Sequence, residues 1–298
     1  MKTEKDDTTM TSHPKRNPLA GHEAFTLIEL LVVLTILAIL ATMLLPALAG
    51  TRSNSQIAQC LNDKRQLSVA WLMYAEENFD FFISNTSWIP SSPGMDWTSS
   101  SYNTNTALLA DPAQATIALY VKSASLFKCP ADNYQSPANP GPRVRSISLN
   151  GVLAGFLGSA GPTVQGSAPG NGQYFGRSGI TTSAGNCRKM TDLAKPGPVN
   201  IFLILDEHPD SINDGSFLLD PGYAPGSEKW RDLPASYHNG AAGISFTDGH
   251  AEMHAWKQIT GANKTVYPVT MTHSLPWQFV NTGVSADYEW LNAGMPYR

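Results

Sequence analysis

FTLIELLVVLTILAILATMLL, residues 25–45, is the stretch that decides the fold, because it contains 21 residues and Glu29 is its one charge. As a helix this segment spans roughly 31 Å, close to the thickness of the hydrocarbon core of a bilayer. A secretory signal peptide has a shorter apolar region and then a small-residue cleavage site, whereas this run continues into Pro46 and a helical pattern. The sequence therefore predicts a membrane-spanning helix, with Lys15 and Arg16 holding its N-terminal end in the cytoplasm.

Glu29 is the anomaly in this helix. A carboxylate in hydrocarbon is costly, and a charge inside a spanning segment indicates a function that requires a partner. The rest of the segment offers no charged partner, so we expect the partner to belong to another chain.

The residues from Ala24 to Glu29 resemble the type III signal of type IV pilins and type II secretion pseudopilins. The resemblance implies that a prepilin peptidase cuts between Ala24 and Phe25 and methylates the new amine of Phe25. Glu29, then the fifth residue, would neutralise the N-terminal amine of a neighbouring subunit, and Pro46 is the proline typical of the twenty-second position. Ala24 departs from the glycine of the family, but a cut after Gly21 would place Glu29 eighth.

Beyond Pro46 the helical pattern continues to about Asn78, and the proline is expected to kink the helix. Apolar side chains at spacings of three, four and seven predict one buried stripe, with most charges outside it. The predicted stripe is Ile57, Cys60, Leu61, Leu67, Trp71 and Tyr74, and the charges are Asp63, Lys64 and Arg65.

The remaining chain predicts an antiparallel sheet with long loops. Residues 199–205 form a continuous apolar run typical of a buried strand, and residues 243–256 predict a hairpin with a type I′ turn at Asp248-Gly249. A short helix is expected over 111–121 and irregular structure in the tail.

The expected fold class is α+β and pilin-like, a long N-terminal helix packed on an antiparallel β-sheet. The expected domains are a leader (1–24), a transmembrane and assembly half of the helix (25–46), an amphipathic half (47–79) and an extracytoplasmic domain (80–298) with a hairpin at 238–249.

His238, followed after nine residues by Asp248-Gly249, resembles the H-x9-DG C-terminal signature of a pilin-like subfamily named for prepilin processing. One interpretation is structural, with His238 hydrogen-bonding the turn or Asp206. A second is a cation site of Asp206, Glu207, His238 and Asp248, where carboxylates would suit Ca²⁺ and histidine Zn²⁺. Resemblance to calcium-binding major pseudopilins supports the second, and a catalytic His/Asp pair is a third.

The three cysteines allow one disulfide outside the cytoplasm, and the predicted pair is Cys60 and Cys129, with Cys187 left over. His250, Glu252 and His254 alternate along one strand, where a solvated polar face is the favoured interpretation and a metal clasp the alternative.

Composition narrows the functional classes. The net charge of -4 leaves no excess of basic residues for nucleic acid, and charged residues make up only 15%. G-x-S-x-G, H-E-x-x-H and P-loop motifs do not occur, so we expect no enzyme.

The resemblance implies a non-enzymatic subunit that polymerises through its apolar helix into a type II secretion pseudopilus or a type IV pilus-like filament. Its partners would be copies of itself, other pilin-like subunits, the prepilin peptidase and an inner-membrane assembly platform, and its location the inner membrane and then the filament. The alternative is an anchored carbohydrate- or metal-binding module that does not polymerise. In that module, sugar rings would stack on the side chains of Trp88, Trp97 and Trp230; the other interpretation is that these tryptophans pack on the sheet.

Overall fold

The computed structural model describes residues 26–85, 87–90, 94–96, 98, 100–121, 123–135, 141–153, 187–220, 229–257, 280–281 and 285–296. The chain divides into two compact units, Met1–Gly50 and Thr51–Arg298. Ala24, Phe25 and Trp97, and with them the predicted leader and cleavage point, lie outside the described residues.

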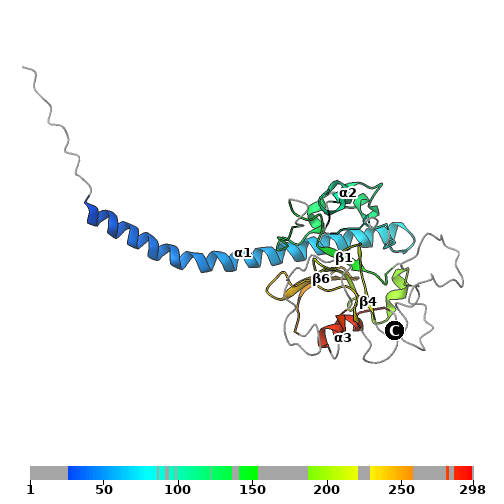
Figure 1. Cartoon of the computed structure of the whole chain (residues 1–298). Helices are drawn as coiled ribbons and strands as arrows, with labels where there is room; N and C mark the ends of the chain where they lie inside the picture. Colours follow the sequence, from blue (N-terminus) through cyan, green and yellow to red (C-terminus); the bar gives the residue numbers. More distant parts are fainter. Residues whose placement is uncertain are drawn as a thin grey trace, which may run out of the picture. The chain divides into compact units, whose positions relative to one another are not determined.

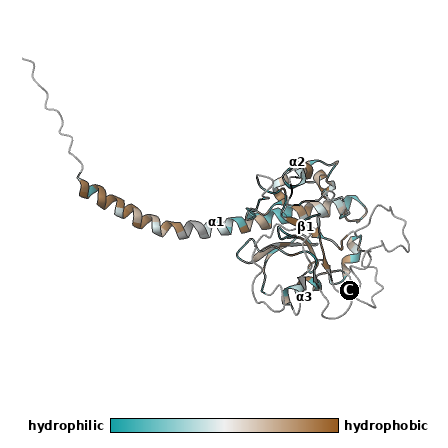
Figure 2. Cartoon of the chain, viewed as in Figure 1, coloured by the Kyte–Doolittle hydropathy of each residue, from teal (hydrophilic) through white to brown (hydrophobic). Residues whose placement is uncertain are grey.

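The first unit contains the start of helix α1, which runs over Leu27–Glu77. Every described side chain from 26 to 45 is exposed, and Figure 2 shows this part of the helix as its most hydrophobic stretch. Within the described residues, α1 is the one helix long and apolar enough to cross a membrane. The helix continues through Pro46, so the proline does not end it, and the kink expected there stays a prediction.

In the second unit, the remainder of α1 buries one face. The predicted stripe is confirmed at Cys60, Leu67 and Trp71, which are at most 2% exposed. The prediction that the neighbouring charges lie outside the buried face is wrong for two of them, because Asp63 and Lys64 are only 7% and 2% exposed.

The main sheet has five strands in the order β3-β1-β2-β6-β7, and every pairing is antiparallel except that of β1 with β3. The expected α+β class is therefore confirmed. A second sheet has the order β4-β5-β8. The strands are β1 (Ile147–Asn150), β2 (Phe202–Asp206), β3 (Ser216–Phe217), β4 (Leu219–Asp220), β5 (Lys229–Trp230), β6 (Ala241–Phe246), β7 (Ala251–Ala255) and β8 (Val280–Asn281).

The strands β1, β2 and β3 of the main sheet are fully buried, whereas the edge strand β7 is partly exposed. In Figure 1, the second part of α1 and helix α2 (Ala107–Ala110) lie on one side of the sheet and helix α3 (Ala286–Ala293) on the other. Leu203 and Ile204 of β2 belong to the apolar cluster that contains Trp71, while Phe202 and Leu205 belong to a second one. Burial on both faces explains why β2 is a continuous apolar run in the sequence.

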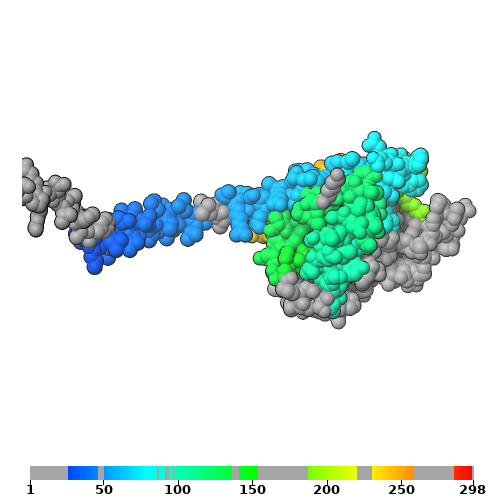
Figure 3. Space-filling view, turned by 90° about the horizontal axis from the view of Figure 1, so that it is seen from above, coloured from blue at the N-terminus to red at the C-terminus, as the bar shows by residue number. Residues whose placement is uncertain are grey.

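Short helices fill the space beside α1, and the described residues between 101 and 150 lie along it on the face seen in Figure 3. The prediction that a helix begins at Asp111 is wrong. Asp111 is the residue at which α2 ends, and its carboxylate accepts a hydrogen bond from the Ala113 amide. The tail is also more regular than expected, because Ser285 caps α3. The 3₁₀ helices are η1 (Ser101–Asn103), η2 (Thr116–Leu119), η3 (Ala124–Phe127) and η5 (Met190–Ala194).

Two tight turns flank β6. The predicted hairpin of β6 and β7 is confirmed, but its turn is not type I′, since Gly249 has a positive φ of 92° and Asp248 does not. The Gly249 amide donates to the Phe246 carbonyl, the pattern of a three-residue loop that ends in a left-handed glycine. The type I′ geometry occurs earlier, at Asn239 (φ 52°) and Gly240 (φ 88°).

Candidate functional site

The start of α1 forms a capping box. The Glu29 carboxylate accepts hydrogen bonds from the Thr26 amide (2.8 Å) and the Thr26 hydroxyl (2.6 Å). The Glu29 amide donates to the Thr26 hydroxyl at 3.3 Å. Glu29 therefore has a hydrogen-bond partner in its own helix, although an uncharged one. Both bonds to the carboxylate go to Oε2, so a charged partner from another chain can approach Oε1 without displacing Thr26.

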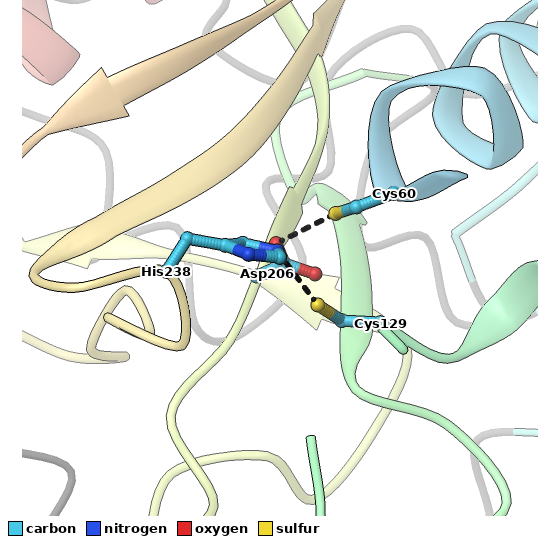
Figure 4. Close-up of side chains that lie close together, drawn as sticks. All are labelled: Cys60, Cys129, Asp206 and His238. Atoms are coloured by element: carbon cyan, nitrogen blue, oxygen red, sulfur yellow. Dashed lines mark hydrogen bonds between the residues drawn. The ribbon is translucent and has the colours of Figure 1, made fainter. Parts of the chain in front are cut away.

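A second candidate site is a buried cluster of Cys60, Cys129, Asp206 and His238, shown in Figure 4 and called the cysteine cluster below. One ligand atom from each residue lies within 4.8 Å of those of the other three. The Cys60 sulfur is 3.5 Å from Asp206 Oδ2, and the Cys129 sulfur is 3.1 Å from His238 Nε2. In the described part of the chain, the cysteine cluster is the one group of metal-ligating side chains gathered this closely.

Four separate segments supply the cluster, and local structure fixes each of them. Cys60 lies on the buried face of α1, and Asp206 is the last residue of β2. Cys129 follows η3 and donates its amide to the Ser146 hydroxyl at 2.7 Å. His238 precedes the Asn239-Gly240 turn and exchanges both backbone hydrogen bonds with Ala241, which places its ring beside the other three side chains.

Lys64 is the cation of this region. Its ammonium is 2.8 Å from Asp206 Oδ1 and 3.0 Å from the Cys60 sulfur. A hydrogen bond with Cys129 lowers the pKa of Cys60; burial opposes this shift, Lys64 reinforces it, and the net result is a pKa of about 3. Burial, reinforced by the negative charge of Cys60 and opposed by Lys64, raises the pKa of Asp206 to about 7. Burial raises the pKa of Lys64's neighbour Asp63 to about 6.

Gly243 of β6 lets α1 approach the sheet at this point. A Cβ at Gly243 would lie 2.9 Å from the Cys60 sulfur and 3.1 Å from both Cε and Nζ of Lys64. Its amide also donates to Asp206 Oδ2 at 3.0 Å. A side chain at position 243 would therefore force Cys60 and Lys64 to shift.

We expect Gly243→Ala to destabilise the chain by about 1–3 kcal/mol, because α1 must move away from β6 or the cluster must rearrange. The measurement is urea unfolding of the detergent-solubilised chain, followed by tryptophan fluorescence. Gly50→Ala is the matched control, since a Cβ there meets nothing within 4 Å. Equal unfolding midpoints for the Gly243 variant and the wild type would contradict the close approach.

The residues of the predicted cation set do not lie together. Asp206 and His238 belong to the cluster, whereas the Glu207 carboxylate hydrogen-bonds the Ser148 and Ser211 hydroxyls. Asp248 is in the β6–β7 turn, where its carboxylate is 2.6 Å from His250 Nδ1. Two sulfur atoms and an imidazole also suit Ca²⁺ poorly, because Ca²⁺ takes oxygen ligands.

In the structure, Cys60 and Cys129 lie close together and are not joined by a disulfide. Their disulfide therefore stays a prediction. Cys187 is also a free, buried thiol, in the apolar cluster around Trp71.

The other candidate residues have structural surroundings. His254 stacks on Trp290, with ring centroids 3.7 Å apart, and is only partly exposed, which departs from the expected solvated face. Trp88 and Trp230 are 2% and 0% exposed, so neither is a surface platform for a sugar.

Sequence reasoning missed Lys64 as the partner of Asp206 and Cys129 as the neighbour of His238. The Asn239-Gly240 dipeptide, a strong hairpin signal, could have placed His238 at a strand end. The burial of Lys64 had no such signal, because a lysine beside Asp63 and Arg65 is typical of a solvated helix face.

Residues 20–45 match the family model of the prokaryotic N-terminal methylation motif. The match covers the capping box and the apolar first part of α1, so the chain carries the N-terminal methylation motif of type IV pilin-like subunits. Neither the curated proteins nor the solved structures gave a significant match to the chain.

Proposed function

We propose that this chain is a non-enzymatic subunit of a type II secretion pseudopilus or a type IV pilus-like filament, polymerised through the apolar part of α1. The observation that carries the proposal is the carboxylate of Glu29 within the methylation motif, on a helix whose described side chains from 26 to 45 are otherwise uncharged and exposed. Apolar side chains exposed along such a length require a membrane or other copies of the helix to cover them.

Glu29 has a role in both settings. Before assembly its carboxylate caps the helix through Thr26. After cleavage between Ala24 and Phe25, the new amine of Phe25 brings a positive charge to the end of the helix. In a filament, the Glu29 carboxylate of one subunit would pair with the Phe25 amine of its neighbour, which removes two isolated charges from an apolar environment.

The proposed location and partners follow from this assembly route. The leader 1–24 stays in the cytoplasm, the helix from 25 to 46 spans the inner membrane, and the chain from 47 onward is extracytoplasmic. The partners are the prepilin peptidase, an inner-membrane assembly platform and copies of this or other pilin-like subunits. The carbohydrate-binding alternative loses support, because Trp88 and Trp230 are buried.

We expect the protein in native membranes to begin at N-methylated Phe25, as measured by intact mass and N-terminal sequencing. Because Ala24 replaces the glycine of the pilin signal, an Ala24→Gly variant should raise the processed fraction. An intact Met1, or a cleavage beyond Leu45, would overturn the proposed processing and leave an anchored or secreted module.

A further inference from the structure

The cysteine cluster has the composition and shape of a metal centre. We propose that Cys60, Cys129, Asp206 and His238 bind one Zn²⁺ in a closed, four-ligand structural site. All four residues belong to the second unit, Thr51–Arg298, so the proposal does not rest on the proposed function of the apolar segment.

The spacing of the donor atoms supports a tetrahedral ion. With Zn–S distances of about 2.3 Å and Zn–N or Zn–O distances of about 2.0 Å, neighbouring ligand atoms in a tetrahedron lie roughly 3.3–3.8 Å apart. In the cluster, the distance is 3.5 Å between the Cys60 and Asp206 ligand atoms and 3.1 Å between those of Cys129 and His238. All other pairs lie within 4.8 Å. Small side-chain rotations would therefore place the four donors around one ion.

The charges of the zinc-bound site also balance. If both cysteines bind the ion as thiolates, they and the Asp206 carboxylate carry three negative charges, and Lys64 supplies one positive charge at 2.8 Å from Asp206. A buried site must be close to neutral, because uncompensated charges are expensive away from water. A divalent ion together with Lys64 therefore balances the three anions of the bound site.

The donor types select the metal. Cysteine sulfur and histidine nitrogen are the usual ligands of structural zinc sites, and an aspartate oxygen is an accepted fourth ligand. Hard cations such as Ca²⁺ and Mg²⁺ prefer oxygen throughout. The four residues are at most 6% exposed, which fits a site without an open position for a substrate.

Surrounding groups already orient the ligands. Lys64 and the Gly243 amide both hydrogen-bond the Asp206 carboxylate, and Lys64 also contacts the Cys60 sulfur. Such outer contacts fix the ligands in known metal sites. The bound ion would join α1, β2, the turn before β6 and the segment after η3, and would thereby hold the helix on the sheet.

The test is the metal content of the full chain, purified in detergent with a non-chelating reductant and equilibrated with ZnCl₂. We expect about one zinc per chain by elemental analysis after removal of unbound ion. Cobalt substitution should give tetrahedral visible bands together with sulfur-to-cobalt charge-transfer absorption. Chelation should lower the unfolding temperature.

Cys60→Ser and Cys129→Ser should each lower zinc content at least tenfold at limiting metal, with loss of the cobalt–sulfur band. Cys187→Ala is the matched control, because Cys187 is buried elsewhere and should keep full occupancy. Wild-type protein that retains less than a tenth of a zinc per chain would overturn the proposal, whether or not the variants fold. Recovery of a Cys60–Cys129 disulfide from native membranes, in samples trapped with a thiol reagent, would also overturn it.

Discussion

A Glu29→Gln variant should accumulate in the membrane at wild-type level and fail to enter filaments. Glutamine serves in a capping box as glutamate does, so the contacts with Thr26 are kept while the negative charge is lost. An amine left unpaired in an apolar interface costs about 3 kcal/mol or more, which corresponds to at least a hundredfold loss of incorporation. The measurement is the ratio of sheared-filament protein to membrane protein by immunoblot.

Thr26→Val is the matched control for this experiment. It removes the hydroxyl that contacts Glu29 but keeps the carboxylate, so incorporation should fall severalfold at most, since a lost cap costs about 1 kcal/mol. If the glutamine variant assembles normally while the valine variant does not, Glu29 acts as a helix cap and the proposed pairing between subunits is wrong.

The Lys64→Met variant should lose about 3–5 kcal/mol of stability, because it leaves Asp206 and Cys60 buried without their cation. The Lys64 and Asp206 side chains are 2% and 0% exposed, so water cannot replace the ammonium. Chemical unfolding of the detergent-solubilised chain measures the loss, and Lys64→Arg, which keeps the charge, should recover part of it.

Arg65→Met provides the comparison with an exposed charge. It removes the same charge from the next position of α1, where the side chain is exposed and donates one hydrogen bond to the Ala251 carbonyl at 3.1 Å. We expect a loss of about 1 kcal/mol. An equal loss of unfolding free energy in the two methionine variants would show that the buried ion pair stabilises the chain no more than the exposed charge does.

The long helix, β2 and the β6–β7 hairpin were predictable because each has a strong local signal. The apolar run at 25–45 has the length of a bilayer, β2 is continuously apolar, and the Asp248-Gly249 pair lies between two alternating segments. Strand β1 was missed, because its four residues, Ile-Ser-Leu-Asn, are buried on both faces although two are polar. Its position between β2 and β3 depends on pairing with distant segments, which leaves no local pattern.

The candidate site was predictable only in part for the same reason. Asp206 follows the predicted strand at 199–205, and His238 was identified from the H-x9-DG pattern, but Glu207 and Asp248, close to them in sequence, point to other partners. Cys60 is 146 residues from Asp206 along the chain, and only the packing of α1 against the sheet brings them together. Contacts of that range are not encoded in any short stretch.

The boundary between the two units falls inside a helix, and this has a practical consequence for work on the isolated ectodomain. Leu67, Trp71 and Ala75 of α1 belong to the core of the second unit. A soluble fragment that begins where the helix ends, near residue 80, would lack the second part of α1. It would expose the apolar surface that this part of the helix covers, so it should aggregate. A fragment that begins near Thr51 keeps the second part of α1 and omits the apolar segment.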